Sequence, residues 1–99
     1  MVEDPFFAVL RMRIRLARLA KGIKQEDIAE RASLQLRSYA RFEAVKPDRG
    51  RFNPTVGTLR LIATALELDL PALLQEPDES EVDLLKKHMP TRVQKLRKE

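Results

Sequence analysis

The side chains suited to chemistry in this sequence are hydrogen-bond donors, whereas the groups that enzymes use as nucleophiles or metal ligands are scarce. The chain has no cysteine and a single histidine, His88. It has no glycine-rich phosphate loop, and Asp48, Asp69 and Asp83 are scattered rather than paired beside a nucleophile. We therefore expect that the protein is not an enzyme and holds neither a cofactor nor a metal ion.

Arginine is the donor that stands out. The net charge is +4, and because acidic and basic residues balance over 76–99, the basic excess lies in 1–75, where arginine outnumbers lysine. A planar guanidinium suits bidentate contacts to phosphate and to guanine. A solvated protein surface would carry the same charge, so composition leaves both interpretations open.

Nothing in the apolar pattern indicates a membrane protein. The longest wholly apolar run, Phe6–Leu10, is far shorter than the roughly 20 residues of a membrane span. The first residues lack the basic start and apolar stretch of a signal peptide. We expect a cytoplasmic protein with no membrane partner.

Apolar residues recur every three or four positions along the chain, which predicts an all-α fold without strands. The first helix is expected to begin after Asp4-Pro5 and to end at Lys21-Gly22, where glycine permits a left-handed cap. Residues 45–53, rich in proline, glycine and charge, read as an exposed loop. The other helices are expected over about 25–32, about 35–44, from Pro54-Thr55 onward, after a possible cap at Asp69, and over 80–88 after a possible cap at Ser80.

The segment Gln25–Ala44 contains no glycine or proline, yet its apolar pattern breaks near Ser33. A sharp turn at Ser33-Leu34 would bring the apolar faces on either side to one core, with the small Ala29 at the crossing point. These faces consist of Ile28, Ala29 and Ala32 before the break and of Tyr39 and Phe42 after it. Two helices joined in this way form a helix-turn-helix, although ordinary helical hairpins that bind no DNA share the pattern.

The chain also resembles the Xre/Cro/phage-repressor type of DNA-binding domain over roughly 10–74. The resemblance rests on Gly22-x-x-Gln25, Ile28-Ala29, Ala32, Leu34, Tyr39, Phe42-Glu43, Pro54-Thr55 and Leu59-x-x-Ile62-Ala63-x-x-Leu66. It implies a compact five-helix, lambda-repressor-like helix-turn-helix domain over 1–77. Residues 78–99 would form a short C-terminal extension, helical or partly disordered.

The sequence departs from the family pattern at four places. Ser33 stands where the turn glycine is usual, and Tyr39 replaces a branched aliphatic residue, so that its hydroxyl needs a partner. Ala44-Val45 replaces the usual Asn/Glu-Gly, and the following loop, 45–53, is a few residues longer than is typical.

The resemblance further implies that the helix after the turn enters the DNA major groove. The implied base contacts are Gln35, Leu36, Arg37 and Arg41, and the implied phosphate contacts are Gln25, Arg18, Ser38, Lys46, Arg49, Arg51 and Asn53. Arg18 would also form a structural salt bridge with Glu43, because a carboxylate on the inward side of a helix needs a cation. A dimer interface is expected at Leu70, Leu73 and Leu74, although these leucines would equally suit the core of the domain.

The function expected from this resemblance is a transcriptional regulator, most simply a repressor. It would bind double-stranded DNA at an inverted-repeat operator as a homodimer. The alternative is an antitoxin of a toxin–antitoxin pair, in which residues 78–99 bind a toxin protein while the domain represses its own promoter. The feature behind this alternative is the extension's split charge, acidic first and basic afterwards, since such segments can order on a partner.

Overall fold

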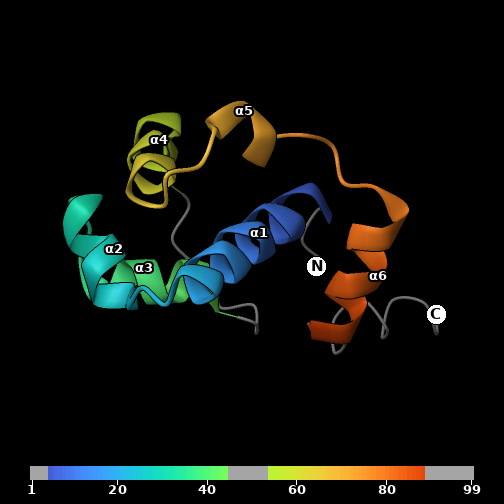
Figure 1. Cartoon of the computed structure of the whole chain (residues 1–99), viewed down its shortest axis with the longest axis horizontal. Coiled ribbons are helices and arrows are strands. Elements are labelled where there is room, and N and C mark those ends of the chain that lie inside the picture. Colours follow the sequence, from blue (N-terminus) through green and yellow to red (C-terminus); the bar gives the residue numbers. More distant parts are fainter. Residues whose placement is uncertain (1–4, 45–53, 89–99) are drawn as a thin grey trace.

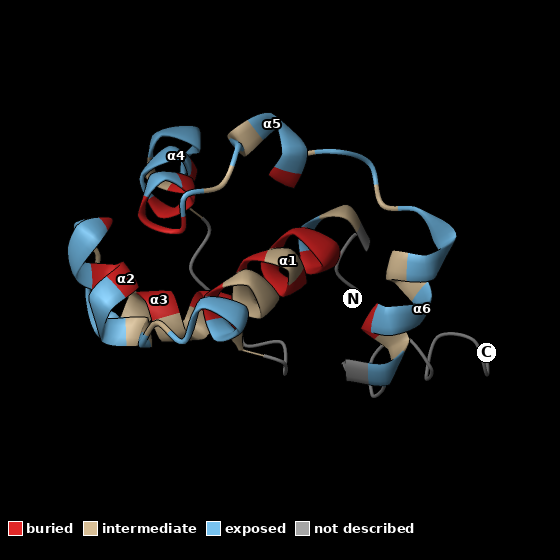
Figure 2. Ribbon diagram, viewed as in Figure 1, coloured by how far each residue is buried: buried red, intermediate tan, exposed pale blue. Residues whose placement is uncertain are grey.

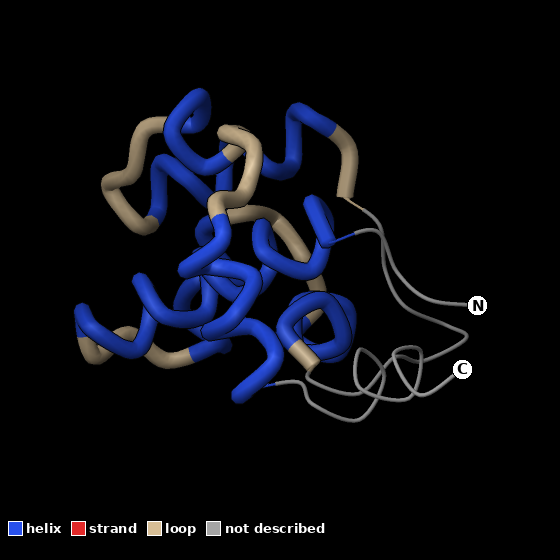
Figure 3. The backbone as a smooth tube through the Cα atoms, turned by 90° about the vertical axis from the view of Figure 1, so that its right-hand side faces the viewer, coloured by secondary structure: helices blue, strands red, loops and turns tan. Residues whose placement is uncertain are grey.

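The computed structural model describes residues 5–44 and 54–88, and all regular structure in these two ranges is helical. Its helices are, in chain order, α1 (Pro5–Lys21), α2 (Gln25–Arg31), α3 (Leu36–Glu43), α4 (Val56–Ala65), α5 (Leu70–Leu73) and α6 (Glu79–His88) (Figure 1). Figure 3 shows the described segments from the side, with loops and no strand between the helices. The prediction of an all-α fold is confirmed for these residues.

Helix α1 runs through the middle of the molecule (Figure 1). It contacts α3, α5 and α6, while α2 packs on both α3 and α4. Figure 2 shows that the buried faces of α1 to α5 turn toward one another, so that these helices enclose one core. Its buried members are Leu10, Ile14, Ile28, Ala29, Ala32, Tyr39, Phe42, Leu59, Ile62, Ala63, Ala65, Leu66 and Leu73.

The turn between α2 and α3 is built by the backbone of Ser33, whose φ is +58°. The Leu34 N–H donates to the Ala29 carbonyl at 2.8 Å, and the Ser33 N–H donates to the Glu30 carbonyl at 3.1 Å. This pair of hydrogen bonds is the Schellman arrangement, which ends a helix on a left-handed residue. The predicted break at Ser33 is therefore confirmed, and serine adopts the conformation that glycine would adopt with less strain.

Two further helices end in the same way. Gly22 has a φ of +67° after α1, and Glu67 has a φ of +58° after α4. In each case the following N–H bonds back to a carbonyl five residues earlier, from Ile23 to Arg18 at 3.2 Å and from Leu68 to Ala63 at 2.8 Å. These closed ends turn the chain sharply, which allows short helices to surround one core.

Helix α6 forms a second, smaller core with the N-terminal half of α1. Leu85 is 1% exposed and packs with Ala8, Val9 and Met12, while Leu16 lies at the edge of this cluster. The cap of α6 differs from the expectation. Asp78, rather than Ser80, accepts the Glu81 N–H at 2.8 Å, while Glu81 Oε1 accepts the Asp78 N–H at 3.3 Å. These reciprocal bonds form a capping box.

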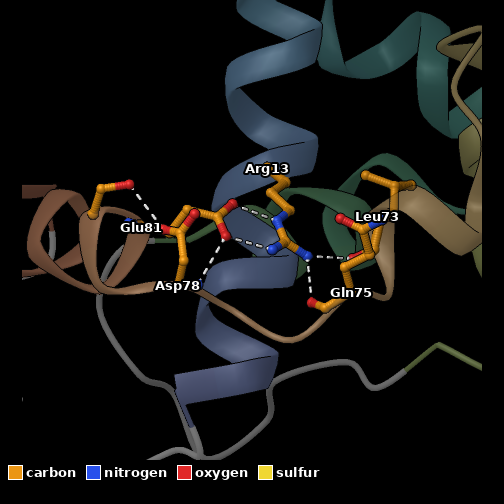
Figure 4. Close-up of polar contacts among 6 residues, drawn as sticks. Arg13, Leu73, Gln75, Asp78 and Glu81 are labelled. Atoms are coloured by element: carbon orange, nitrogen blue, oxygen red, sulfur yellow. Dashed lines mark hydrogen bonds and ion pairs between the residues drawn. The ribbon is translucent and has the colours of Figure 1, made fainter.

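Arg13 ties α6 and the end of α5 to α1 (Figure 4). Its Nε and Nη2 atoms donate to the two carboxylate oxygens of Glu81 at 2.7 and 2.6 Å. Its Nη1 atom donates to the carbonyls of Leu73 and Gln75, each at 2.8 Å. One guanidinium thus satisfies the carbonyl of the last residue of α5 and a carbonyl just beyond that helix, and it anchors the first turn of α6.

In the part of the chain that the structure describes, no helix combines the length and the apolar character needed to cross a bilayer.

Candidate nucleic-acid interface

The N-terminal end of α3 is exposed, whereas later residues of the helix are buried. Tyr39, Phe42 and Glu43 are buried toward α1 and α2. Gln35, which is the N-cap of the helix, and Leu36 and Arg37 in its first turn are exposed. Leu36 is 46% exposed. The N-terminal end of α3 therefore presents an amide, an apolar side chain and a guanidinium to the outside.

Ser38 and Arg41, the other predicted DNA contacts on α3, are half-buried. The structure thus places Gln35, Leu36 and Arg37 together at the N-terminal end of α3, with Ser38 directly after them and Arg41 in the last turn of the helix.

The buried face of α3 ends in a polar cluster around Glu43, which is 3% exposed. Arg18 donates from Nε to Oε2 at 2.7 Å and from Nη2 to Oε1 at 2.9 Å, so the expected salt bridge is present and bidentate. The Tyr39 hydroxyl donates to Oε2, and Gln25 Nε2 donates to Oε1 at 3.1 Å. Side chains from α1, α2 and α3 therefore meet on one carboxylate.

The electrostatics of this cluster follow from burial and hydrogen bonding. Burial raises the pKa of the Glu43 carboxyl, but the hydrogen bonds from Arg18, Tyr39 and Gln25 outweigh it and hold that pKa below its ordinary value. Burial also raises the pKa of the Tyr39 hydroxyl, and the hydrogen bond to Glu43 raises it further. Glu43 is therefore an anion, Tyr39 a neutral donor, and the cluster a compensated buried charge pair.

Two of the predicted phosphate contacts, Arg18 and Gln25, donate hydrogen bonds within this cluster. Arg18 is 9% exposed, and its Nη1 atom donates to the Ile23 carbonyl at 2.8 Å in addition to the two bonds to Glu43. With three hydrogen bonds made inside the protein, Arg18 serves the fold, and the expectation that it also contacts phosphate stays a prediction. Gln25 is half-buried, and only one of its two amide N–H groups is needed for the bond to Glu43.

Lys46, Arg49, Arg51 and Asn53, the remaining predicted phosphate contacts, lie outside the described residues. The expected dimer interface at Leu70, Leu73 and Leu74 stays a prediction, and the structure shows how far each leucine is buried within the chain. Leu73 is 5% exposed and belongs to the core, and Leu70 and Leu74 are half-buried against the same core. These leucines are largely used within the chain.

Sequence reasoning missed the side-chain network around Glu43 beyond Arg18. Tyr39 and Glu43 are four residues apart, which places them on one helix face and was a usable signal for the hydroxyl's partner. Gln25 lies on another helix, so no local spacing identified it. Arg13 was also missed, because two of its acceptors are backbone carbonyls, which leave no trace in a sequence.

No family model matches this chain, and neither a curated protein nor a solved structure gives a significant match. Within residues 5–44 and 54–88, no group of three or more acidic or histidine side chains is arranged to hold a metal ion.

Proposed function

We propose that the protein is a sequence-specific, double-stranded DNA-binding regulator of the Xre/Cro type, in which α1 to α5 form the helix-turn-helix domain. The observation that carries this proposal is the difference in burial between the N-terminal end of α3 and the rest of the helix. One face locks into the core through Tyr39 and Phe42, while the N-terminal end exposes Gln35, Leu36 and Arg37. A recognition helix needs this arrangement, because its first residues must reach base edges while its body stays fixed.

The exposed side chains match the chemistry of the major groove. Arginine can donate two hydrogen bonds to guanine, and glutamine can pair with the N6 and N7 atoms of adenine. An exposed leucine can contact the methyl group of thymine. Gln35, Leu36 and Arg37 together could therefore distinguish bases, and the half-buried Arg41 would extend the contact one turn further along α3.

Binding as a homodimer at an inverted repeat belongs to the same proposal. A single small domain contacts few base pairs, and two copies on half-sites about one helical turn apart would supply the missing specificity. Leu73 lies in the core, so the support for a dimer is the small size of the domain and the family resemblance.

The test is selection of bound duplexes from a random DNA pool at a stated salt concentration. We expect an inverted-repeat consensus whose half-sites are separated by about 34–36 Å, or one turn of DNA. A pool without a consensus, bound with an affinity that depends only on salt, would show nonspecific binding and contradict the proposal.

DNA binding is preferred to the alternative in which residues 78–99 mainly bind a toxin protein. Within that segment, α6 is already engaged by its own chain, through Leu85 in the small core and Glu81 on Arg13. A toxin would have to displace these contacts or use other residues of the extension. A protease-resistant complex formed through 78–99 on addition of a partner protein would reverse this preference.

A further inference from the structure

The two oxygens of the Glu43 carboxylate accept hydrogen bonds from different sets of donors. Oε2 accepts from Arg18 Nε and from the Tyr39 hydroxyl, whereas Oε1 accepts from Arg18 Nη2 and from Gln25 Nε2. The Tyr39 ring is fully buried, and its hydroxyl is directed to a carboxylate on its own helix. The hydroxyl and Arg18 together fix the carboxylate, and the position of Oε1 then fixes the amide of Gln25.

The orientation of the Gln25 amide follows from this geometry. An ionised carboxylate can only accept hydrogen bonds, so the amide must turn its nitrogen, not its oxygen, toward Glu43. One N–H of Nε2 is used there, and the second N–H remains for another acceptor. Because Gln25 is half-buried at the first residue of α2, its amide lies between the buried cluster and the surface.

We propose that Tyr39 is a positioning residue for DNA binding: its hydroxyl holds Glu43, and Glu43 in turn aims the Gln25 amide at a backbone phosphate. This inference rests on the proposed DNA-binding function and deepens it. A bound phosphate oxygen would accept the second N–H of Nε2, so that a single amide bridges the buried carboxylate and the DNA. Tyr39 contacts no DNA in this scheme and acts only through its neighbours.

The substitution Tyr39→Phe removes the hydroxyl and leaves the buried ring in place. Arg18 remains paired with Glu43, so the carboxylate stays ionised and the core stays filled. What is lost is the second donor on Oε2 and, with it, the restraint that keeps Oε1 in line with Gln25. This variant should therefore change the environment of the Gln25 amide and lower the affinity for DNA. Its preference among DNA sequences should not change.

The test is a double-mutant cycle of Tyr39→Phe and Gln25→Ala, with affinity measured on the duplex selected by the unsubstituted protein. We expect Gln25→Ala to weaken binding roughly tenfold, as for one hydrogen bond to a charged group, and to leave the salt slope nearly unchanged, because a neutral amide displaces no counterion. We expect Tyr39→Phe alone to weaken binding by about threefold to tenfold on the same reasoning. In the Gln25→Ala background, Tyr39→Phe should have no further effect.

A second measurement needs no DNA. The side-chain amide protons of Gln25, observed by NMR, should be shifted from the values of a solvated glutamine in the unsubstituted protein and should move toward them in Tyr39→Phe. The exposed Gln35 amide serves as the control and should not change.

The outcomes separate the two proposals. If the unsubstituted protein selects a consensus but the losses from Tyr39→Phe and Gln25→Ala are additive, the hydroxyl acts on the fold in general and the positioning role is overturned. The same holds if Tyr39→Phe leaves both affinity and the Gln25 resonances unchanged. If the unsubstituted protein selects no sequence at all, the proposed function fails and the positioning role fails with it.

Discussion

Ser33 carries backbone strain that another residue would relieve. Its φ of +58° lies in the left-handed region, which costs a non-glycine residue about 1–2 kcal/mol. We expect Ser33→Gly to raise the free energy of unfolding by about 0.5–1 kcal/mol, because part of this relief is offset by the greater entropy of glycine in the unfolded chain. A urea titration of both proteins measures the change.

The matched control for this prediction is Ser38→Gly, a change of the same size in the interior of α3. It should lower stability by about 0.5–1 kcal/mol, since glycine weakens a helix interior. A loss of stability in both variants would contradict the view that the turn at Ser33 is strained.

The charge on Glu43 matters because the group that it neutralises is buried. In Glu43→Ala, the Arg18 guanidinium would keep its charge at 9% exposure without its bidentate partner. We expect a loss of about 3 kcal/mol in the free energy of unfolding, as for other broken buried pairs. Glu30→Ala, on the exposed side of α2, is the control and should change stability by less than about 0.5 kcal/mol. A loss below about 1 kcal/mol for Glu43→Ala would contradict the buried-pair interpretation.

The same pair predicts a pH dependence. The pKa of Glu43 is lowered in the folded protein, so the folded state binds a proton to this group less readily than the unfolded state does. Its contribution to stability is therefore complete above the ordinary pKa of 4.5 and is lost as pH falls through the lower folded value. Unfolding titrations between about pH 6 and pH 2 should show a shallower slope for Glu43→Gln than for the unsubstituted protein. Equal slopes would exclude Glu43 as a source of acid lability.

At the scale of the helices, local signals in the sequence predicted the turn after α2 but misassigned the cap of α6. The break near Ser33 was predicted because the apolar faces of α2 and α3 could meet only across a turn. The start of α6 was misassigned by two residues because Asp78 and Ser80 are both good caps. Asp78 takes that role since Glu81, three residues later, can return the hydrogen bond.

The docking of α6 could not be predicted, because its anchors are distant in sequence. Arg13 and Glu81 are separated by 68 positions, and the one buried leucine of α6, Leu85, is indistinguishable in sequence from its exposed neighbour Leu84. Because α6 has few apolar residues, its attachment to α1 depends on the hydrogen bonds of Arg13 as well as on the burial of Leu85.

This dependence leads to a prediction for Glu81→Gln. The change removes the charge that Arg13 pairs with, a pair whose hydrogen bonds raise the pKa of Arg13 and lower that of Glu81. Since both side chains are partly exposed, we expect a loss of only about 1 kcal/mol, confined to α6. Hydrogen exchange should then be about fivefold faster at the amides of α6 and unchanged in α2 and α4.

Lys86→Gln, which removes only a 4.0 Å surface pair with Asp83, is the control and should leave exchange in α6 nearly unaltered. Uniformly faster exchange in all helices would show that α6 is part of one cooperative unit with the domain.

At the scale of the whole molecule, the burial of side chains distinguishes between roles that the residue types alone leave open. Leucines at a short helix suit a dimer interface and a core equally well, and the structure buries Leu73 in the core while Leu70 and Leu74 are half-buried against it. An arginine near a helix end suits phosphate and carboxylate equally well, and Arg18 is committed to Glu43. By contrast, Arg37 lies opposite Tyr39 and Phe42 in helical phase, so its exposure follows from the sequence, whereas Gln35 and Leu36 are exposed because they lie at the N-terminal end of α3.

The last prediction compares two exposed arginines on different helices. Arg37 lies in the first turn of α3, whereas Arg60 lies on α4, which packs on α2 and α5. If α3 enters the major groove, Arg37→Ala should weaken binding to the selected duplex by about 1–3 kcal/mol and relax the preference at a single base pair. Arg60→Ala removes the same charge and should leave the preference at every position unchanged, with at most a small, uniform loss of affinity. The two variants should be compared by repeating the selection and by titrating the consensus duplex at several salt concentrations. Equal, sequence-independent losses in both would mean that Arg37 acts only through its charge, and α3 would then no longer be the recognition helix.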